Sequence, residues 1–209
     1  MQYVGMYAKA SDTCVLAAHV ESPSFYQQLS QLSSNVVKID ISGSSAIAFF
    51  IALNSKSVVL PFFVGSEIVS KLKQAGLEAN LYKGKNLAIG NLVAANDKAA
   101  ICSTIFTKTE LKQIGDWLGV EAVQVDISPY KTPGSFIVAT NKGVCVSPFI
   151  KHKLSDIEEI LKVSGEITTC SMGSAFLHVG IVANSRGALV SAGSSGFEMG
   201  QIESALGLV

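Results

Sequence analysis

The sequence predicts an α/β ring of five repeated units, each about 42 to 45 residues long, within a chain of 209 residues. Three observations lead to this fold class. Polar turns flanked by apolar runs recur at a nearly constant spacing, and a helical pattern lies between successive turns. No stretch of different composition marks an end cap or an interdomain linker.

The repeated turns follow short apolar runs. Asn54, Asn96, Asn141 and Ser185 lie 42, 45 and 44 residues apart, and a step of 43 residues back from Asn54 reaches Ser11. The runs beside each turn are near-continuous in apolar residues, which is typical of strands covered on both faces. Polar residues and glycine at the tips suit tight turns. We therefore expect five β-hairpins of the same kind.

A short helix is predicted after each hairpin. Three pairs have the spacing of a capping box, and two further sites have a serine at a plain helix start. They are Thr107 with Glu110, Ser155 with Glu158, Ser195 with Glu198, Ser22 before Pro23, and Ser66 before Glu67. Apolar residues follow at helical spacing, so these helices are expected to cover the core.

One unit of this size cannot bury its own apolar face, and a linear stack would need polar caps at both ends. Closure into a ring removes both difficulties. The expected organisation is a single domain, residues 1–209, a five-bladed α/β propeller with pseudo-fivefold symmetry. The five repeats are expected at about residues 1–36, 37–78, 79–121, 122–164 and 165–209.

Charge and hydropathy exclude several classes of protein. Sixteen basic residues balance sixteen acidic ones, and only one of the basic residues is an arginine, Arg186. This balance disfavours binding that depends on neutralising many phosphates. The longest apolar run, residues 46–53, is shorter than the roughly 18 to 20 residues that span a bilayer. The N-terminus has no signal-peptide pattern, so we expect a soluble cytoplasmic protein without a membrane partner.

No cofactor, metal site or catalytic site is expected. The four cysteines, Cys14, Cys102, Cys145 and Cys170, form no CxxC pair and should be free, buried thiols. Cys170 and His178 are eight residues apart and are expected on one extended strand, too distant to act together. No acidic cluster lies near a cysteine, and no phosphate-binding or hydrolase motif is present.

Several segments carry a family resemblance. They are residues 4–10 (VGMYAKA), 88–97 (AIGNLVAAND), 133–143 (PGSFIVATNKG) and 180–190 (GIVANSRGALV), with further matches at 196–198 and 205–206. In order and spacing these segments resemble the archaeal and eukaryotic translation initiation factor 6 family, and they extend over nearly the whole chain. The five-bladed ring likewise resembles the pentein fold of that family.

The resemblance implies a function without catalysis. Members of the family bind the intersubunit face of the large (50S) ribosomal subunit and sterically prevent association with the small subunit, and they are linked to large-subunit maturation. The implied partner is mainly a ribosomal protein near the sarcin–ricin loop, with ribosomal RNA contact left open, and the implied state is a monomer of the shorter archaeal form. The alternative is a pentein ring that serves as a scaffold for a different protein partner. An enzyme of the guanidine-modifying pentein class is disfavoured.

The resemblance also assigns a binding patch. Counted five residues before each turn, the positions expected on one face of the ring, together with two glycines beside them, are Gly5, Met6, Phe49, Gly90, Asn91, Phe136 and Gly180. The chain departs from the family at two places. Phe49 follows Ala48 where the family usually has Gly-Arg, and Ser171 stands where it usually has Asn. At the first place a guanidinium with five donors is replaced by apolar area.

Overall fold

The apolar runs on both sides of the polar turns form antiparallel strand pairs, which confirms the five hairpins. The computed structural model describes all residues 1–209. The pairs are β1 (Ala8–Ala10) with β2 (Val15–Ala18), β4 (Ala52–Leu53) with β5 (Ser57–Pro61), β7 (Val93–Ala95) with β8 (Ala99–Cys102), β10 (Ile137–Ala139) with β11 (Gly143–Val146), and β13 (Ile181–Asn184) with β14 (Gly187–Val190).

In four of the five sheets a third strand pairs in parallel with the second. These strands are β3 (Val36–Ile39), β6 (Glu78–Tyr82), β9 (Glu121–Gln124) and β12 (Ser164–Ile167). The fifth sheet contains only β13 and β14. Each third strand joins the sheet of the preceding hairpin and therefore belongs to that repeat. The first four repeats thus end three or four residues later than expected from the sequence.

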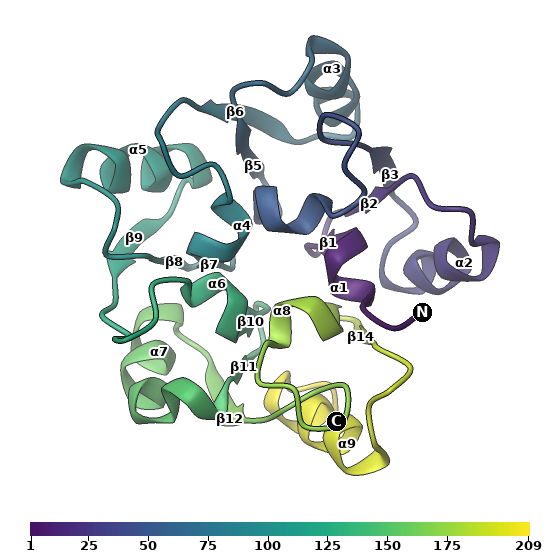
Figure 1. The fold of residues 1–209 in the computed structure, drawn as a ribbon, viewed down its shortest axis with the longest axis vertical. Helices are drawn as coiled ribbons and strands as arrows, with labels where there is room; N and C mark the ends of the chain where they lie inside the picture. Colours follow the sequence, from purple (N-terminus) through teal and green to yellow (C-terminus); the bar gives the residue numbers. More distant parts are fainter.

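One helix packs at the rim of each unit, as Figure 1 shows. These outer helices are α2 (Pro23–Leu32), α3 (Ser66–Gln74), α5 (Lys108–Leu118), α7 (Leu154–Leu161), which follows the 3₁₀ segment η2 (Pro148–Lys153), and α9 (Gly196–Ala205). We call one sheet with its helices a blade and number the blades one to five along the chain.

Two of the three predicted capping boxes are present. In both, the hydroxyl of Thr107 or Ser195 accepts a hydrogen bond from the backbone N–H of the glutamate three residues later, Glu110 or Glu198, whose carboxylate bonds back. The third prediction is wrong, because α7 begins one residue before Ser155 and its N-terminus has no side-chain cap.

A second set of helices, four residues each, precedes the first strand of every blade. They are α1 (Val4–Tyr7), η1 (Ile47–Phe50), which is a 3₁₀ helix, α4 (Ile89–Leu92), α6 (Pro133–Phe136) and α8 (Leu177–Gly180). Figure 1 shows these helices gathered around the centre of the ring. We call the side of the molecule that carries them the helix face.

The apolar cores lie between neighbouring blades. Every residue of β2, β5, β8 and β11 is buried, as expected for strands covered on both sides. One core packs Leu16 and Ile39 of the first blade against Ile47 and Leu60 of the second. Val182 of the fifth blade belongs to a core built mainly from the first. Each blade therefore depends on two neighbours, and the ring closes without an end cap.

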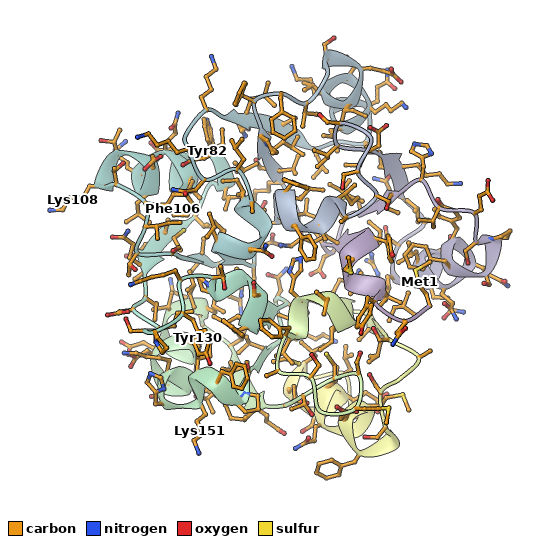
Figure 2. The ribbon with its side chains drawn as sticks, in the orientation of Figure 1. Met1, Tyr82, Phe106, Lys108, Tyr130 and Lys151 are labelled. Atoms are coloured by element: carbon orange, nitrogen blue, oxygen red, sulfur yellow. The ribbon has the colours of Figure 1, made fainter.

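Residues far apart in sequence join the first and fifth blades. The Asn184 side chain donates hydrogen bonds to the carbonyl oxygens of Ser11 at 3.0 Å and Leu32 at 2.9 Å. The backbone N–H of Ala192 donates to the carbonyl oxygen of Met1 at 3.2 Å. Met1, labelled in Figure 2, thus lies at the seam where the ring closes. None of the helices has the length and apolar character needed to cross a bilayer.

Candidate functional site

The hairpin turns define which residues of the five blades are equivalent. The Asn54 side-chain oxygen accepts hydrogen bonds from the second and third backbone N–H groups that follow it. Asn96 and Thr140 make the same pair of bonds, and Asn184 makes the first of them. Ser11 accepts from the corresponding two N–H groups in the first blade. The equivalent positions are therefore Ser11, Asn54, Asn96, Thr140 and Asn184.

The register expected from the sequence is wrong by one residue in the last two blades. It aligned Asn141 and Ser185 with Asn54, whereas the structure aligns Thr140 and Asn184. The shift has a chemical cause, because residues of different type can form the same turn. Thr and Asn oxygens both accept these turn hydrogen bonds, so a match on residue identity selected the neighbouring Asn141.

The correction changes the candidate patch. Met6, Phe49 and Asn91 occupy the third position of their short helices, and all three are partly exposed. Phe136 and Gly180 occupy the fourth position and are buried. The third-position residues of the last two blades are Ser135 and Val179, both partly exposed, and the sequence analysis missed them. No signal in the sequence alone identifies Ser135 and Val179, because the register depends on turn hydrogen bonds that only the structure shows.

Gly5 and Gly90 lie at the second position, where the short helices meet around the axis. A Cβ atom at Gly90 would overlap the carbonyl oxygen of Ala48, and one at Gly134 would overlap that of Gly90. A Cβ atom at Gly5 would overlap the carbonyl oxygen of His178. These glycines therefore let neighbouring backbones approach each other, a structural role beside the exposed third positions.

His178 holds the second position of α8 and is buried. Its ring stacks on Phe49, with ring centroids 5.8 Å apart. Burial and the nearby charge of Lys9 lower the His178 pKa to about 3, against the opposing effect of the Ala48 and Gly134 carbonyl groups. The imidazole is therefore neutral near pH 7, and its Nε2 atom has no hydrogen-bond partner.

A narrow cavity follows the axis beneath His178. Its wall consists mainly of small and apolar residues from the first strands of all five sheets. Lys9 projects into it, donates a hydrogen bond to the Ile51 carbonyl oxygen at 3.0 Å, and has its pKa lowered to about 8 by burial. At the opposite mouth, Asn141 donates to Asp12 at 2.7 Å and Asp97 at 2.6 Å.

None of the four cysteines lines the axial cavity. All four are free and buried, as expected, and burial raises the pKa of Cys102 to about 12 and of Cys170 to about 11. Cys170 does not lie on the first strand of the fifth hairpin, as expected from the sequence. It forms an isolated β-bridge with Ser174, and His178 belongs to α8. A thiol held protonated in this way is a poor nucleophile.

No group of three or more His, Cys, Asp or Glu side chains is arranged to hold a metal ion. The axial cavity holds one lysine and one neutral histidine but no cysteine, so it lacks the nucleophile that the guanidine-modifying chemistry would need. The geometry instead favours contact through the surface.

Large apolar side chains are exposed mainly at the helix face. Each second strand runs antiparallel to the first and so returns to the end of the ring that carries the short helices. The segments that follow these strands, or that precede a short helix, expose Met1, Tyr3, Phe62, Phe63, Ile105, Phe149, Met172 and Phe176. The remaining exposed large apolar residues, Phe197, Met199 and Val209, lie in or after α9.

Four of the aromatic residues form one cluster, which joins the fourth and fifth blades. The Tyr130 and Phe149 rings stack with centroids 5.4 Å apart, and Phe176 lies 6.2 Å from Phe149. The buried Phe136 supports the cluster from below, 4.9 Å from Tyr130 and 5.3 Å from Phe176. Figure 2 labels Tyr130 within the fourth blade. Phe149 and Phe176 are 47% and 49% exposed, so the cluster offers a rigid apolar surface.

Solved structures with the same fold include two of dimethylarginine dimethylaminohydrolase. One is a mutant from Pseudomonas aeruginosa bound to citrulline, with a TM-score of 0.52, 12% identity, and coverage of 77% of this chain and 67% of that one. The other, an adduct with S-methyl-L-thiocitrulline, has a TM-score of 0.53, 11% identity and the same coverage. At these identities the likeness concerns the pentein fold alone.

Sequence comparison is more specific. Translation initiation factor 6 of Pyrococcus abyssi is 33% identical over 215 aligned residues, which cover 99% of this chain and 95% of that protein. The protein of the same name from Thermoplasma acidophilum is 34% identical over 98% of this chain and 94% of its own length. A family model described as eIF-6 family matches residues 1–205. With a ring of this fold and near-complete coverage, the chain belongs to the eIF-6 family.

Proposed function

We propose that this chain binds the large ribosomal subunit through its helix face and prevents the small subunit from joining by occupying the space between them. The observation that carries the proposal is the concentration of exposed aromatic and aliphatic side chains on this one face of an eIF-6 family member. Exposed apolar patches of this kind mark protein interaction surfaces, and aromatic residues contribute most to such contacts.

The proposed partner surface is mainly protein, near the sarcin–ricin loop. The formal net charge is zero and the chain has a single arginine, Arg186, whose Nε donates to the Leu32 carbonyl oxygen at 2.8 Å within the fold. Phe49, where the family usually has arginine, is stacked on His178 and partly exposed. The contact is therefore proposed to rest on apolar burial with Asn91 and Ser135 as polar members, and to depend weakly on salt.

No bond is made or broken in this function. The protein is proposed to act as a cytoplasmic monomer without a cofactor, and to take part in maturation of the large subunit through the same contact. The buried, protonated thiols and the absence of a cysteine from the axial cavity support a role without catalysis.

The test is cosedimentation with isolated large subunits in a sucrose gradient at physiological salt, followed by a subunit-joining assay. We expect the protein to migrate with large subunits and to reduce the formation of joined ribosomes. Asn91→Lys and Phe176→Asp should each weaken binding about tenfold or more. Asn91→Lys should do so without lowering the melting temperature, since its side chain is partly exposed, whereas Phe176→Asp should also lose the packing of Phe176 on Phe136.

Val209→Asp is the control, because Val209 is 91% exposed and follows Gly207, which lies beside Lys142 of a hairpin turn at the opposite end of the ring from the short helices. It should bind like the unmodified protein. Free migration of the unmodified protein at physiological salt would refute the proposal and favour a ring that serves a different protein partner. A steep salt dependence would indicate ribosomal RNA as the main contact.

A further inference from the structure

The axial cavity contains a buried positive charge that has no acidic partner. The Lys9 ammonium group carries three N–H donors, and its one hydrogen bond goes to the Ile51 carbonyl oxygen at 3.0 Å. None of the ion pairs of the structure includes Lys9. Burial is the only cause that shifts its pKa, and no carboxylate acts against it. The ammonium group therefore lacks a counter-charge.

The equivalent position is apolar in every other blade. Lys9 lies two residues before its turn residue, and the matching residues are Ala52, Ala94, Val138 and Val182. The last three line the same cavity. Lys9 is therefore the only charged member of this set of five. A charge among apolar groups is unfavourable unless it is paired.

The carboxylates at the opposite mouth of the cavity are bonded to other groups. Asp97 accepts a hydrogen bond from the Ser55 backbone N–H at 2.7 Å. Asp12 accepts from the backbone N–H and the hydroxyl of Ser185, both at 2.8 Å. These bonds join neighbouring hairpin turns around the mouth and hold both acids there. They leave Lys9 without a partner inside the cavity.

A second open group faces the same cavity. His178 is only 6% exposed, it lines the cavity wall, and its Nε2 atom has no hydrogen-bond partner. In the tautomer that carries the proton on Nε2, this atom is a donor. An ammonium group from the first blade and an imidazole from the fifth thus offer donors to one enclosed space.

The size of the cavity limits what it can hold. Its volume is about 40 Å³. One water-sized sphere requires roughly 10 to 15 Å³ by the same measure, so the cavity has room for about three such groups. This space admits a halide ion with one or two waters, but it is too small for a tetrahedral oxyanion such as phosphate or sulfate.

We propose that the axial cavity binds a chloride ion, held by the Lys9 ammonium group and by the Nε2–H of His178. The ion supplies the missing negative charge and accepts a hydrogen bond from each residue. Because Lys9 also bonds to Ile51, the ion connects groups of the first, second and fifth blades, at the seam where the ring closes. Water is a poorer occupant, since it accepts the same hydrogen bonds without neutralising the charge.

The test is urea denaturation at pH 7, with sodium gluconate replaced by sodium chloride at constant ionic strength. An ion that binds only the folded ring stabilises it by mass action, and gluconate is too large for the cavity. For a dissociation constant of about 10 mM, raising chloride from about 10 to about 200 mM should increase the folding equilibrium constant about tenfold.

Two variants separate this site from general salt effects. Lys9→Met keeps the length of the side chain and removes its charge, and it should abolish the chloride dependence. Lys56→Met is the matched control, because Lys56 is an exposed lysine in a hairpin turn, and it should leave the dependence unchanged. Sulfate stabilises folded proteins in general, so it should act equally on the unmodified protein and on Lys9→Met.

A second measurement needs only the unmodified protein, and it decides the matter if Lys9→Met does not fold. The NMR resonances of the Lys9 side chain and the His178 ring should shift together as chloride is added, and the shifts should saturate. The affinity should fall about tenfold between pH 7 and pH 9, because the pKa of Lys9 is about 8 and the neutral amine offers no charge to the ion.

Three results would overturn the proposal. The first is equal chloride dependence in the unmodified protein and in Lys9→Met. The second is no dependence up to about 200 mM chloride, which would mean that the cavity holds water only. The third is a chloride titration that moves neither the Lys9 nor the His178 resonances. The cavity lies inside the ring, so cosedimentation with ribosomal subunits remains an independent test of the proposed function.

Discussion

The second position of the five short helices is occupied by Gly5, Ala48, Gly90, Gly134 and His178. Four of them are small because the backbones meet at the axis, as the overlaps at the glycines show. The fifth residue, His178, places its imidazole against Phe49 and above Lys9, and no acidic side chain lies there to balance a positive charge. A buried group of this kind is held neutral, so its protonation is linked to the stability of the whole ring.

Acidification should destabilise the protein through His178. Its pKa is about 3 in the folded state against about 6.5 when unfolded, so between these values the unfolded chain binds a proton that the folded chain does not. The stability that the neutral His178 side chain contributes at pH 7 is therefore lost as the pH falls below 6.5. The expected loss between pH 7 and pH 5 is about 2 kcal/mol in the free energy of unfolding, measured by urea denaturation.

The control for this prediction is His178→Asn. Its absolute stability will differ, because the packing around the axis changes, but its pH dependence between pH 7 and pH 5 should be flatter by about the same 2 kcal/mol. Equal slopes for the two proteins would show that His178 is protonated in the folded state and would contradict the assignment.

At this scale the sequence predicted residue types better than residue positions. Met6, Phe49 and Asn91 hold equivalent positions in their blades, as the repeat spacing predicted, although the short helices that carry them were not predicted. Phe136 and Gly180 are one residue too far along, because side-chain oxygens of different residues form the same turn. The stacking of Phe49 on His178 joins residues 129 positions apart in sequence, and no local pattern encodes such a contact.

The loop before α8 shows how one element holds another. Ser171, Met172 and Gly173 all have positive φ values, a conformation that is costly for the first two. The carboxylate of Glu198, from the first turn of α9, accepts from the Gly173 N–H at 2.8 Å and from the Thr169 hydroxyl at 2.8 Å. The capping box of the outer helix thereby fixes a loop of the helix face.

Glu198→Gln should loosen this loop and lower stability by about 2 to 3 kcal/mol, since the charge-assisted hydrogen bonds of a buried carboxylate are lost. For a chain of this length the melting temperature should fall by roughly 4 to 12 °C. Burial acts to raise the pKa of this carboxyl, but its hydrogen bonds outweigh that effect and lower the pKa to about 2. Its contribution is therefore present above pH 4.5 and is lost between pH 4.5 and pH 2.

Glu110→Gln is the matched control, because Glu110 closes the same kind of capping box on α5 without touching the loop. Both variants should lose stability, but only Glu198→Gln should speed hydrogen exchange at the Gly173 amide. Unchanged exchange at Gly173 in the Glu198 variant would argue against its role in holding the loop.

The elements that have a contiguous signal in the sequence were predicted, and those without one were not. Hairpins, whose turns and apolar runs are contiguous, were all identified, and so were the boxes at Thr107 and Ser195. The short helices were not predicted, because four residues give no period to detect. The parallel third strands were not assigned either, since their partners lie about twenty residues away and pairing alone identifies them.

For the whole molecule, Met1 and Val209 lie beside β14, the outer strand of the one sheet that has no third strand. By comparison with β6 and β9, Val209 stands where a third strand would begin and the Met1 carbonyl oxygen where it would end, with three residue positions between them. A linker of Ala-Val-Gln, the sequence of residues 122–124, should therefore join Val209 to Met1 and complete the sheet in a cyclised protein.

Cyclisation with this linker should raise the free energy of unfolding by about 2 to 4 kcal/mol, because the unfolded chain loses the freedom of two ends. A Gly-Gly-Gly linker of the same length is the control, and thermal denaturation is the measurement. The Ala-Val-Gln form should be more stable than the glycine form by about 1 kcal/mol or more, since only the former favours a strand. Equal stability of the two would show that no third strand forms.

The seam between the first and fifth blades has a consequence for synthesis on the ribosome. Asn184 bonds to Ser11 across 173 residues, so the first blade has no closing neighbour until almost the whole chain has been made. At about 5 to 20 residues per second, that interval is roughly 10 to 35 s. During it the apolar flank of the nascent first blade is open to water and to other chains, and early contact with a chaperone at the exit tunnel would protect it.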